Sequence, residues 1–173
     1  MRPHSTAPRC QRGLSLINLI VTIVIISILA AFAVRKMNQA GDDTLWYQAQ
    51  RLARDIRHVQ VLSSTWGRQL QITPTTGTNG TYSVSCVVSA SSPCNGTSTI
   101  TDPTTGNAFT VTLQKGVSLA VSGTNPTKFD NQGRPLSSAG AINSASTSYT
   151  LTYNGTSVVV AIAPVTGYVS TTP

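Results

Sequence analysis

The sequence predicts an α+β protein in which a long N-terminal helix packs on a C-terminal antiparallel β-sheet head. Three observations support this fold class. Residues 14–34 are an uncharged apolar run, and residues 45–59 repeat apolar side chains at helical spacing. From Arg68 onward, short runs of β-forming residues alternate with Gly, Pro, Asn and Ser. At 173 residues, the chain is long enough for one head domain and an appendage.

The charge composition favours a secreted bacterial protein over a cytosolic enzyme. Charged residues make up only 10% of the chain, Glu is absent, and the formal net charge is +7. Three of the positive charges lie within residues 1–13. The remaining +4 is the difference between nine basic and five acidic residues. The basic residues are Arg35, Lys36, Arg51, Arg54, Arg57, Arg68, Lys115, Lys128 and Arg134, and the acidic residues are Asp42, Asp43, Asp55, Asp102 and Asp130. This mild excess allows contact with anionic lipid or nucleic acid but requires neither.

The apolar run 14–34 has the length of a transmembrane helix. A helix rises ~1.5 Å per residue, so about twenty residues cross a hydrocarbon layer of ~30 Å. Arg9 and Arg12 favour a cytoplasmic N-terminal flank, although Arg35 and Lys36 on the far side weaken the charge contrast. We therefore expect a single-pass anchor.

A cleaved secretory signal peptide is the alternative interpretation of this N-terminus. Its apolar region is usually only about 7–15 residues long and ends at a small-residue cleavage site. Residues 30–33, with the sequence AAFA, could form such a site, whereas Gly13 precedes the apolar run. The length of the run favours a retained helix.

The sequence RGLSLINLI at residues 12–20 resembles the type III signal of type IV prepilins and pseudopilins. The resemblance implies that residues 1–13 are a leader, that prepilin peptidase cuts after Gly13, and that Leu14 becomes the methylated N-terminus. A glycine at the cut lets the peptidase approach the backbone closely. The apolar helix 14–34 is then retained as the transmembrane segment and filament core.

Asn18 departs from this family, which normally has Glu at the fifth mature position. The family carboxylate is thought to pair with the N-terminal ammonium of a neighbouring subunit, and a buried charge needs a partner. Asn18 can accept a hydrogen bond but cannot neutralise that ammonium. One hypothesis is a tip-proximal position with no subunit ahead, and the other is a harmless polar replacement.

Residues 35–66 are expected to continue into the head as an amphipathic helix, after a break at Gly41 with Asp42, Asp43 and Thr44 as caps. One apolar stripe consists of Leu45, Ala49, Leu52, Ile56 and Val59. Gly67 should end the helix. A basic strip of Arg51, Arg54, Arg57 and Arg68 is expected to be a solvated face, with contact to a neighbour or a polyanion as the alternative. His58 is expected at the surface and not as a ligand.

The β-rich head is expected over residues 67–173. Candidate strands are 69–73, 81–88, 108–113, 117–121, 147–153 and 157–163. Asn154-Gly155 predicts a tight antiparallel hairpin across 147–163, and Asn79-Gly80 predicts a similar turn. Pro126, Pro135 and Gly140 indicate a long loop.

Cys86 and Cys94 are the two cysteines that remain once Cys10 leaves with the leader. Seven residues separate them, so a disulfide would close a short polar loop, as oxidising compartments allow. Two free thiols are the alternative. No zinc set is expected, because four ligands are needed and no other Cys or His is near in sequence.

Two stretches of the head are similar to the GspH/FimT branch of pseudopilins and minor pilins, and in particular to a minor pilin of mannose-sensitive haemagglutinin systems. They are FDNQGRP at residues 129–135 and APVTGYV at residues 163–169. The resemblance implies a type IV pilin-like fold, in which a helix is wrapped by two antiparallel sheets.

The resemblance implies a minor pilin or pseudopilin subunit, placed near the tip or as an assembly initiator in a type IV pilus or type II secretion pseudopilus. Its partners would be prepilin peptidase, other pilin subunits and the inner-membrane assembly platform, with the head first in the periplasm and then at the cell surface. No catalytic residues, cofactor or metal are expected, because carboxylates and histidines are few. A DNA-binding minor pilin and an adhesive tip subunit are the alternatives.

Overall fold

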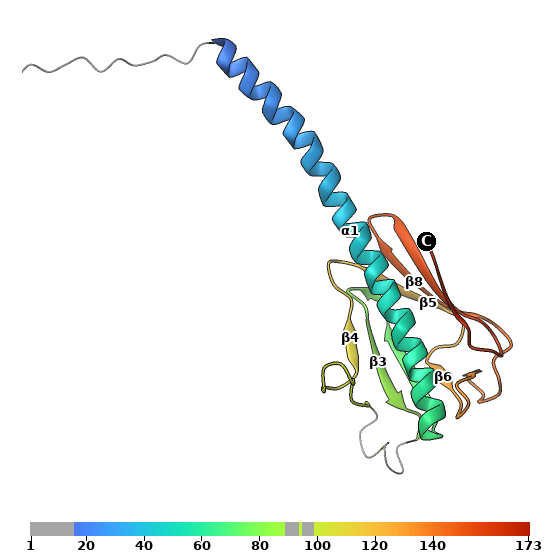
Figure 1. Cartoon of the computed structure of the whole chain (residues 1–173). Coiled ribbons are helices and arrows are strands. Elements are labelled where there is room, and N and C mark those ends of the chain that lie inside the picture. The colour runs from blue at the N-terminus through green and yellow to red at the C-terminus, as the bar shows by residue number, and fades with distance from the viewer. Residues whose placement is uncertain (1–15, 89–93, 95–98) are drawn as a thin grey trace, which may run out of the picture. The chain divides into compact units, whose positions relative to one another are not determined.

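A computed structural model describes residues 16–88, 94 and 99–173, with the backbone alone for residues 31–43 (Figure 1). The leader 1–13, the predicted cut after Gly13 and the methylation of Leu14 lie outside the described residues. The chain divides into two compact units, one ending at Gln39 and one spanning Ala40–Pro173. The α+β prediction is confirmed.

Helix α1 runs from Leu16 to Trp66 without interruption. The predicted break at Gly41 is therefore wrong. A single interior glycine costs only about 1 kcal/mol relative to Ala, and helix propagation through it is favoured by the hydrogen-bonded turns on either side. In the described part of the chain, no helix is both long enough and apolar enough to cross a membrane.

The predicted end of the helix at Gly67 is confirmed. Gly67 has a φ of +62°, which a residue without a side chain adopts at low cost. The Arg68 N–H donates to the Ser63 carbonyl at 3.1 Å, and this bond closes the last turn in the Schellman pattern.

The head contains two five-stranded antiparallel sheets. The first has the order β4-β3-β1-β6-β7, with β4 Thr110–Thr112, β3 Thr81–Cys86, β1 Leu70–Thr75, β6 Thr127–Phe129 and β7 Pro135–Leu136. The second has the order β10-β9-β8-β5-β2, with β10 Val169–Thr172, β9 Thr156–Ile162, β8 Thr147–Tyr153, β5 Ser118–Ser122 and β2 Gly77–Thr78. The predicted pair of antiparallel sheets is present.

The six predicted strands all appear, with their ends shifted by a few residues. The hairpin prediction is confirmed, because β8 pairs with β9 and Asn154 and Gly155 both have positive φ, +47° and +83°. At the second predicted turn only Asn79 has positive φ, and the Gly80 N–H closes the turn on the Gly77 carbonyl at 3.1 Å.

The long loop predicted around Pro126, Pro135 and Gly140 is wrong in part, because it contains the short strands β6 and β7. Pro135 is tolerated in β7 because this strand lies at the edge of its sheet, where a missing N–H breaks no ladder. The short strands β2 and β10 were also not among the predicted runs.

The apolar stripe of α1 lies in the core of the head, as predicted. Its five residues are at most 1% exposed, and they share one buried cluster with side chains of both sheets. The largest of these sheet side chains are Tyr82, Phe129 and Tyr149. The second half of α1 is therefore held by the head over several turns.

Candidate functional site

The first turns of α1 carry an apolar surface with few polar groups. Large apolar side chains between Leu16 and Leu29 are about half to three-quarters exposed. The Thr22 hydroxyl donates to the Leu19 carbonyl at 2.8 Å, and the Ser27 hydroxyl donates to the Ile23 carbonyl at 2.6 Å. These hydroxyls are thus satisfied by their own helix, and such bonding is tolerated in an apolar environment.

Asn18 also lies in this exposed segment of α1. Unlike the two hydroxyls, its amide forms no hydrogen bond within the described residues. Asn18 is therefore an exposed polar side chain within the described apolar segment.

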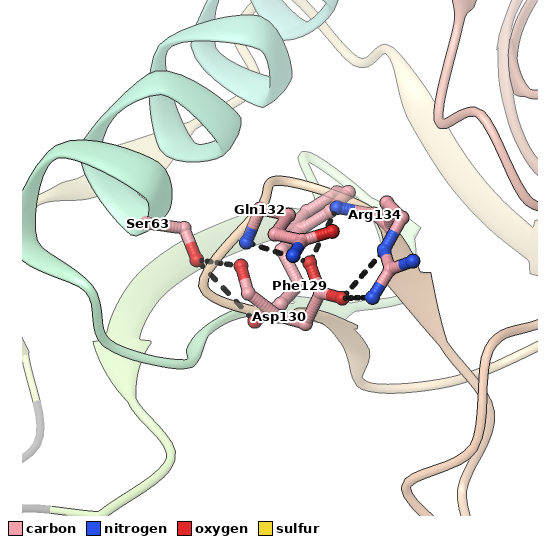
Figure 2. A network of polar contacts seen from close by, with 5 residues as sticks. All are labelled: Ser63, Phe129, Asp130, Gln132 and Arg134. Atoms are coloured by element: carbon pink, nitrogen blue, oxygen red, sulfur yellow. Dashed lines mark hydrogen bonds and ion pairs between the residues drawn. The ribbon is translucent and has the colours of Figure 1, made fainter.

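At the other end of α1, Ser63 forms a hydrogen bond with the turn at residues 129–135 (Figure 2). Its hydroxyl lies 2.5 Å from the Asp130 carbonyl and 2.7 Å from the Arg68 carbonyl. Because a hydroxyl carries one proton, it donates to one of these carbonyls at a time. Ser63 is fully buried, so this contact fixes the turn against the helix.

The Asp130 carboxylate organises the turn itself. Its Oδ1 accepts the backbone N–H groups of Gln132 at 2.9 Å and Arg134 at 2.8 Å, and its Oδ2 contacts the Arg134 guanidinium at 2.8 Å (Figure 2). Burial raises the pKa of Asp130, but these hydrogen bonds and the nearby positive charge outweigh it, so the pKa lies below its ordinary value.

Gln60 brings together the two stretches that carry the family resemblance of the head. Its side-chain amide donates to the carbonyls of Gly133 at 3.2 Å and Gly167 at 2.7 Å. One turn earlier, the Arg57 guanidinium donates to the Val169 carbonyl at 2.8 Å. No local sequence pattern indicates the role of Gln60, because its partners are more than seventy residues away.

The glycines of these two stretches are required by close packing on α1. A Cβ on Gly167 would lie 2.5 Å from the Gln60 amide nitrogen, and one on Gly133 would lie 3.1 Å from the Gln60 carbonyl oxygen. Both also have positive φ, +76° for Gly133 and +72° for Gly167. The motif glycines therefore serve the junction between the helix and the turns.

The predicted basic strip is divided between different contacts. Arg51 lies 3.9 Å from Asp55, a distance at which the ion pair is weak, while Arg54 is exposed. Arg57 contacts the backbone of β10. The strip is thus not one uniform cationic surface.

A polar group is buried where α1 meets β3. The Tyr82 hydroxyl donates to Asp55 Oδ2 at 2.6 Å. Burial raises the pKa of Asp55, and the Tyr82 bond and the nearby Arg51 and Arg54 offset this only in part. Burial and the Asp55 charge likewise raise the pKa of Tyr82.

His58 was expected at the surface but is half-buried, with its ring centroid 6.4 Å from that of Phe109. Its Nε2 is buried and has no hydrogen-bond partner within the described residues. The described residues contain no group of three or more His, Cys, Asp or Glu that could hold a metal. His58 is thus packed as a core-edge residue.

Cys86 and Cys94 form a disulfide, with their Cα atoms 5.9 Å apart. Both side chains are about 5% exposed and belong to the core cluster. The bond therefore attaches Cys94 to the last residue of β3.

Comparison with known proteins gives two findings. The sequence profile described as the prokaryotic N-terminal methylation motif matches residues 8–34. The chain is similar in structure to the minor pseudopilin EpsH from the type 2 secretion system of Vibrio cholerae, with a TM-score of 0.53 and 10% identity over 73% of this chain and 94% of that one. At this identity, the similarity shows the fold alone. No curated protein sequence matches the chain.

Proposed function

We infer that this chain is a minor pilin or pseudopilin subunit of the type IV pilin and pseudopilin family. The methylation motif and the fold of the head together support this assignment. The single observation that carries it is that helix α1 continues from the motif at residues 8–34 directly into a two-sheet head of pseudopilin fold.

We propose that prepilin peptidase cuts after Gly13 and methylates Leu14, and that residues 14–34 are then retained. The exposed apolar surface between Leu16 and Leu29 supports this, because so large an apolar surface must be covered by lipid or protein. In the proposed cycle the helix first lies in the inner membrane, with the head in the periplasm. It then enters a bundle of like helices in the filament.

Extraction from the membrane into such a bundle exchanges one apolar environment for another. Its free-energy cost is therefore small, and packing together with the few polar groups sets the register between helices. The assembly platform and neighbouring pilin subunits are the partners that this cycle requires.

Asn18 supports a position near the tip, or a role as assembly initiator. Its neutral amide cannot pair with the charged N-terminus of a preceding subunit, so burial beside that ammonium is costly. At the tip no subunit lies ahead, and this cost does not arise.

A structural role fits the described residues better than a catalytic or a DNA-binding role. Asp55, Asp102 and Asp130 are all engaged in internal hydrogen bonds. A DNA-binding role is not favoured, because no Lys or Arg follows Arg134 and phosphate binding depends on positive charge.

The test compares Gly13→Ala with Gly41→Ala, a glycine substitution inside α1 and away from the proposed cut. We expect Gly13→Ala to keep the leader and to be missing from sheared filaments, whereas Gly41→Ala is processed and assembled as the wild type. Intact mass and immunodetection of the sheared fraction provide the readouts. Normal processing and assembly of Gly13→Ala would rule out the proposal.

A further inference from the structure

We propose that a groove beside the last turns of α1 binds an acidic peptide segment of a protein partner. In this complex Arg57 pairs with a carboxylate, while Val61 and Tyr168 contact an apolar side chain next to it. The groove has a volume of about 450 Å³. Its lining includes Arg57, Gln60, Val61, Gly133, Gly167 and Tyr168.

The frame of this groove is fixed before any partner arrives. Gln60 bonds both turns that border it, and Ser63 fixes one of them through Asp130. Because the two turns are already held in place, little conformational entropy is lost when a partner binds to them. Such preorganisation generally increases affinity.

Arg57 supplies the one charge that lines the groove. One of its terminal nitrogens donates to the Val169 carbonyl at 2.8 Å, which orients the guanidinium and leaves its other N–H groups for an external acceptor. Arg57 is exposed and forms no ion pair within the part of the chain that the structure describes. A planar guanidinium matches a carboxylate in geometry and charge.

Among mostly polar lining residues, the groove has two exposed apolar side chains, Val61 and Tyr168. Val61 is 59% exposed and Tyr168 is 70% exposed, and Val165 in the same turn as Tyr168 is 52% exposed. Exposed aromatic residues beside an arginine are typical of protein interfaces. These side chains would cover an apolar residue of the partner next to its carboxylate.

The turn that carries Tyr168 also holds a strained residue. Val165 has a φ of +62°, which is costly for a β-branched side chain, and its N–H donates to the Asn143 carbonyl at 2.9 Å. Such conformations persist where the surrounding structure imposes them, often at functional sites. Here the result is that Val165 and Tyr168 are displayed on one exposed turn.

The charge of the head favours an acidic partner. From Thr44 onward the chain has seven bases and three acids, and all three acids are engaged internally. A nucleic acid would need several basic side chains to contact its phosphates, but Arg57 is the one basic residue that lines the groove. One carboxylate with an apolar neighbour fits this combination better.

The test titrates the full chain in detergent micelles with the blocked peptide Gly-Leu-Asp-Leu-Gly and with its Asn counterpart, followed by NMR of the Gly133 and Gly167 amides. We expect saturable shifts with the Asp peptide, at a Kd on the order of 1 mM. We expect about five-fold weaker binding with the Asn peptide, and a similar loss with Arg57→Gln.

Two further variants separate the groove from general charge attraction. Tyr168→Ser removes an exposed side chain and should weaken binding with no change in the unfolding midpoint. Arg54→Gln, an exposed arginine on the same helix outside the groove, should leave binding unchanged. Equal binding of both peptides, an equal loss with Arg54→Gln, no saturable shift at the groove, or preferential binding of a single-stranded oligonucleotide would each overturn the proposal.

Discussion

The side-chain amide of Gln60 donates to the Gly167 carbonyl at 2.7 Å, and this contact joins the last turns of α1 to the turn before β10. The same amide reaches Gly133 in the turn after β6. One helix residue thus holds two turns that are thirty-four residues apart in sequence. Both turns border the proposed binding groove.

Replacing Gly167 with Ala should destabilise the head more than the same change at a glycine in open space. The new Cβ would lie 2.5 Å from the Gln60 amide nitrogen and 3.1 Å from the Gly133 oxygen. Gly106→Ala is the matched control, because Gly106 has a similar φ of +70° with nothing within 4 Å. Chemical denaturation should give a loss of about 1–2 kcal/mol for the control and about 1 kcal/mol more for Gly167→Ala, because the Gln60 amide must move away and lose its hydrogen bonds to the two turns. Equal losses would mean that the crowding is absent.

Asp130→Asn should reduce stability at neutral pH by about 1–2 kcal/mol, because the charged partner of Arg134 is lost. The pKa of Asp130 is lowered in the folded state, so its stabilisation is present above the ordinary value of 3.8 and lost as pH falls through the folded pKa. When the free energy of unfolding is measured from pH 7 down to ~pH 2, the difference between variant and wild type should disappear. Asn131→Ala, an exposed change in the same turn, should show no such convergence.

Asp55→Asn should have the opposite pH dependence. Burial raises the folded-state pKa of Asp55, so its contribution to stability is complete below 3.8 and is lost as pH rises through the folded pKa. The variant keeps an acceptor for the Tyr82 hydroxyl and avoids the buried charge. Its stability relative to the wild type should therefore increase from ~pH 4 to pH 7 in equilibrium unfolding. A difference that shrinks over this range would contradict the raised pKa.

The Cys86–Cys94 disulfide should contribute about 2–3 kcal/mol to the stability of the head, because it constrains the unfolded chain. The double variant Cys86→Ser/Cys94→Ser tests this in denaturation with and without reductant. Reductant should lower the free energy of unfolding of the wild type to that of the variant and leave the value for the variant unchanged. A wild type that is insensitive to complete reduction, verified by thiol titration, would argue against a stabilising bond.

Asn18→Glu should restore the charge that pairs with a neighbouring N-terminus. We expect this variant to spread along the filament shaft, while Asn18→Gln keeps the wild-type position, since Gln has the length of Glu but no charge. Immunogold labelling of sheared filaments distinguishes shaft from tip. Identical labelling of both variants and the wild type would favour the harmless-replacement hypothesis.

Local sequence signals predicted much of this fold. Asn154-Gly155 indicated the β8–β9 hairpin, and the apolar spacing from Leu45 to Val59 indicated the buried face of α1. Both depend on residues close together in sequence, where periodicity and turn chemistry act directly.

The features that were missed depend on distant partners. Gly41 lies within a helix whose cooperativity overrides its low propensity. Strands β6 and β7 are too short to show alternation and form by pairing with each other and with β1. The Gln60 contacts bridge residues 60, 133 and 167, so no local pattern encodes them.

The most direct test of the prepilin assignment is the N-terminal sequence and intact mass of the wild-type protein from membranes and sheared filaments. We expect a chain that begins at N-methylated Leu14 in both fractions. A soluble periplasmic chain that begins after Ala31 or Ala33 would contradict it, because such a protein has lost the helix on which assembly depends.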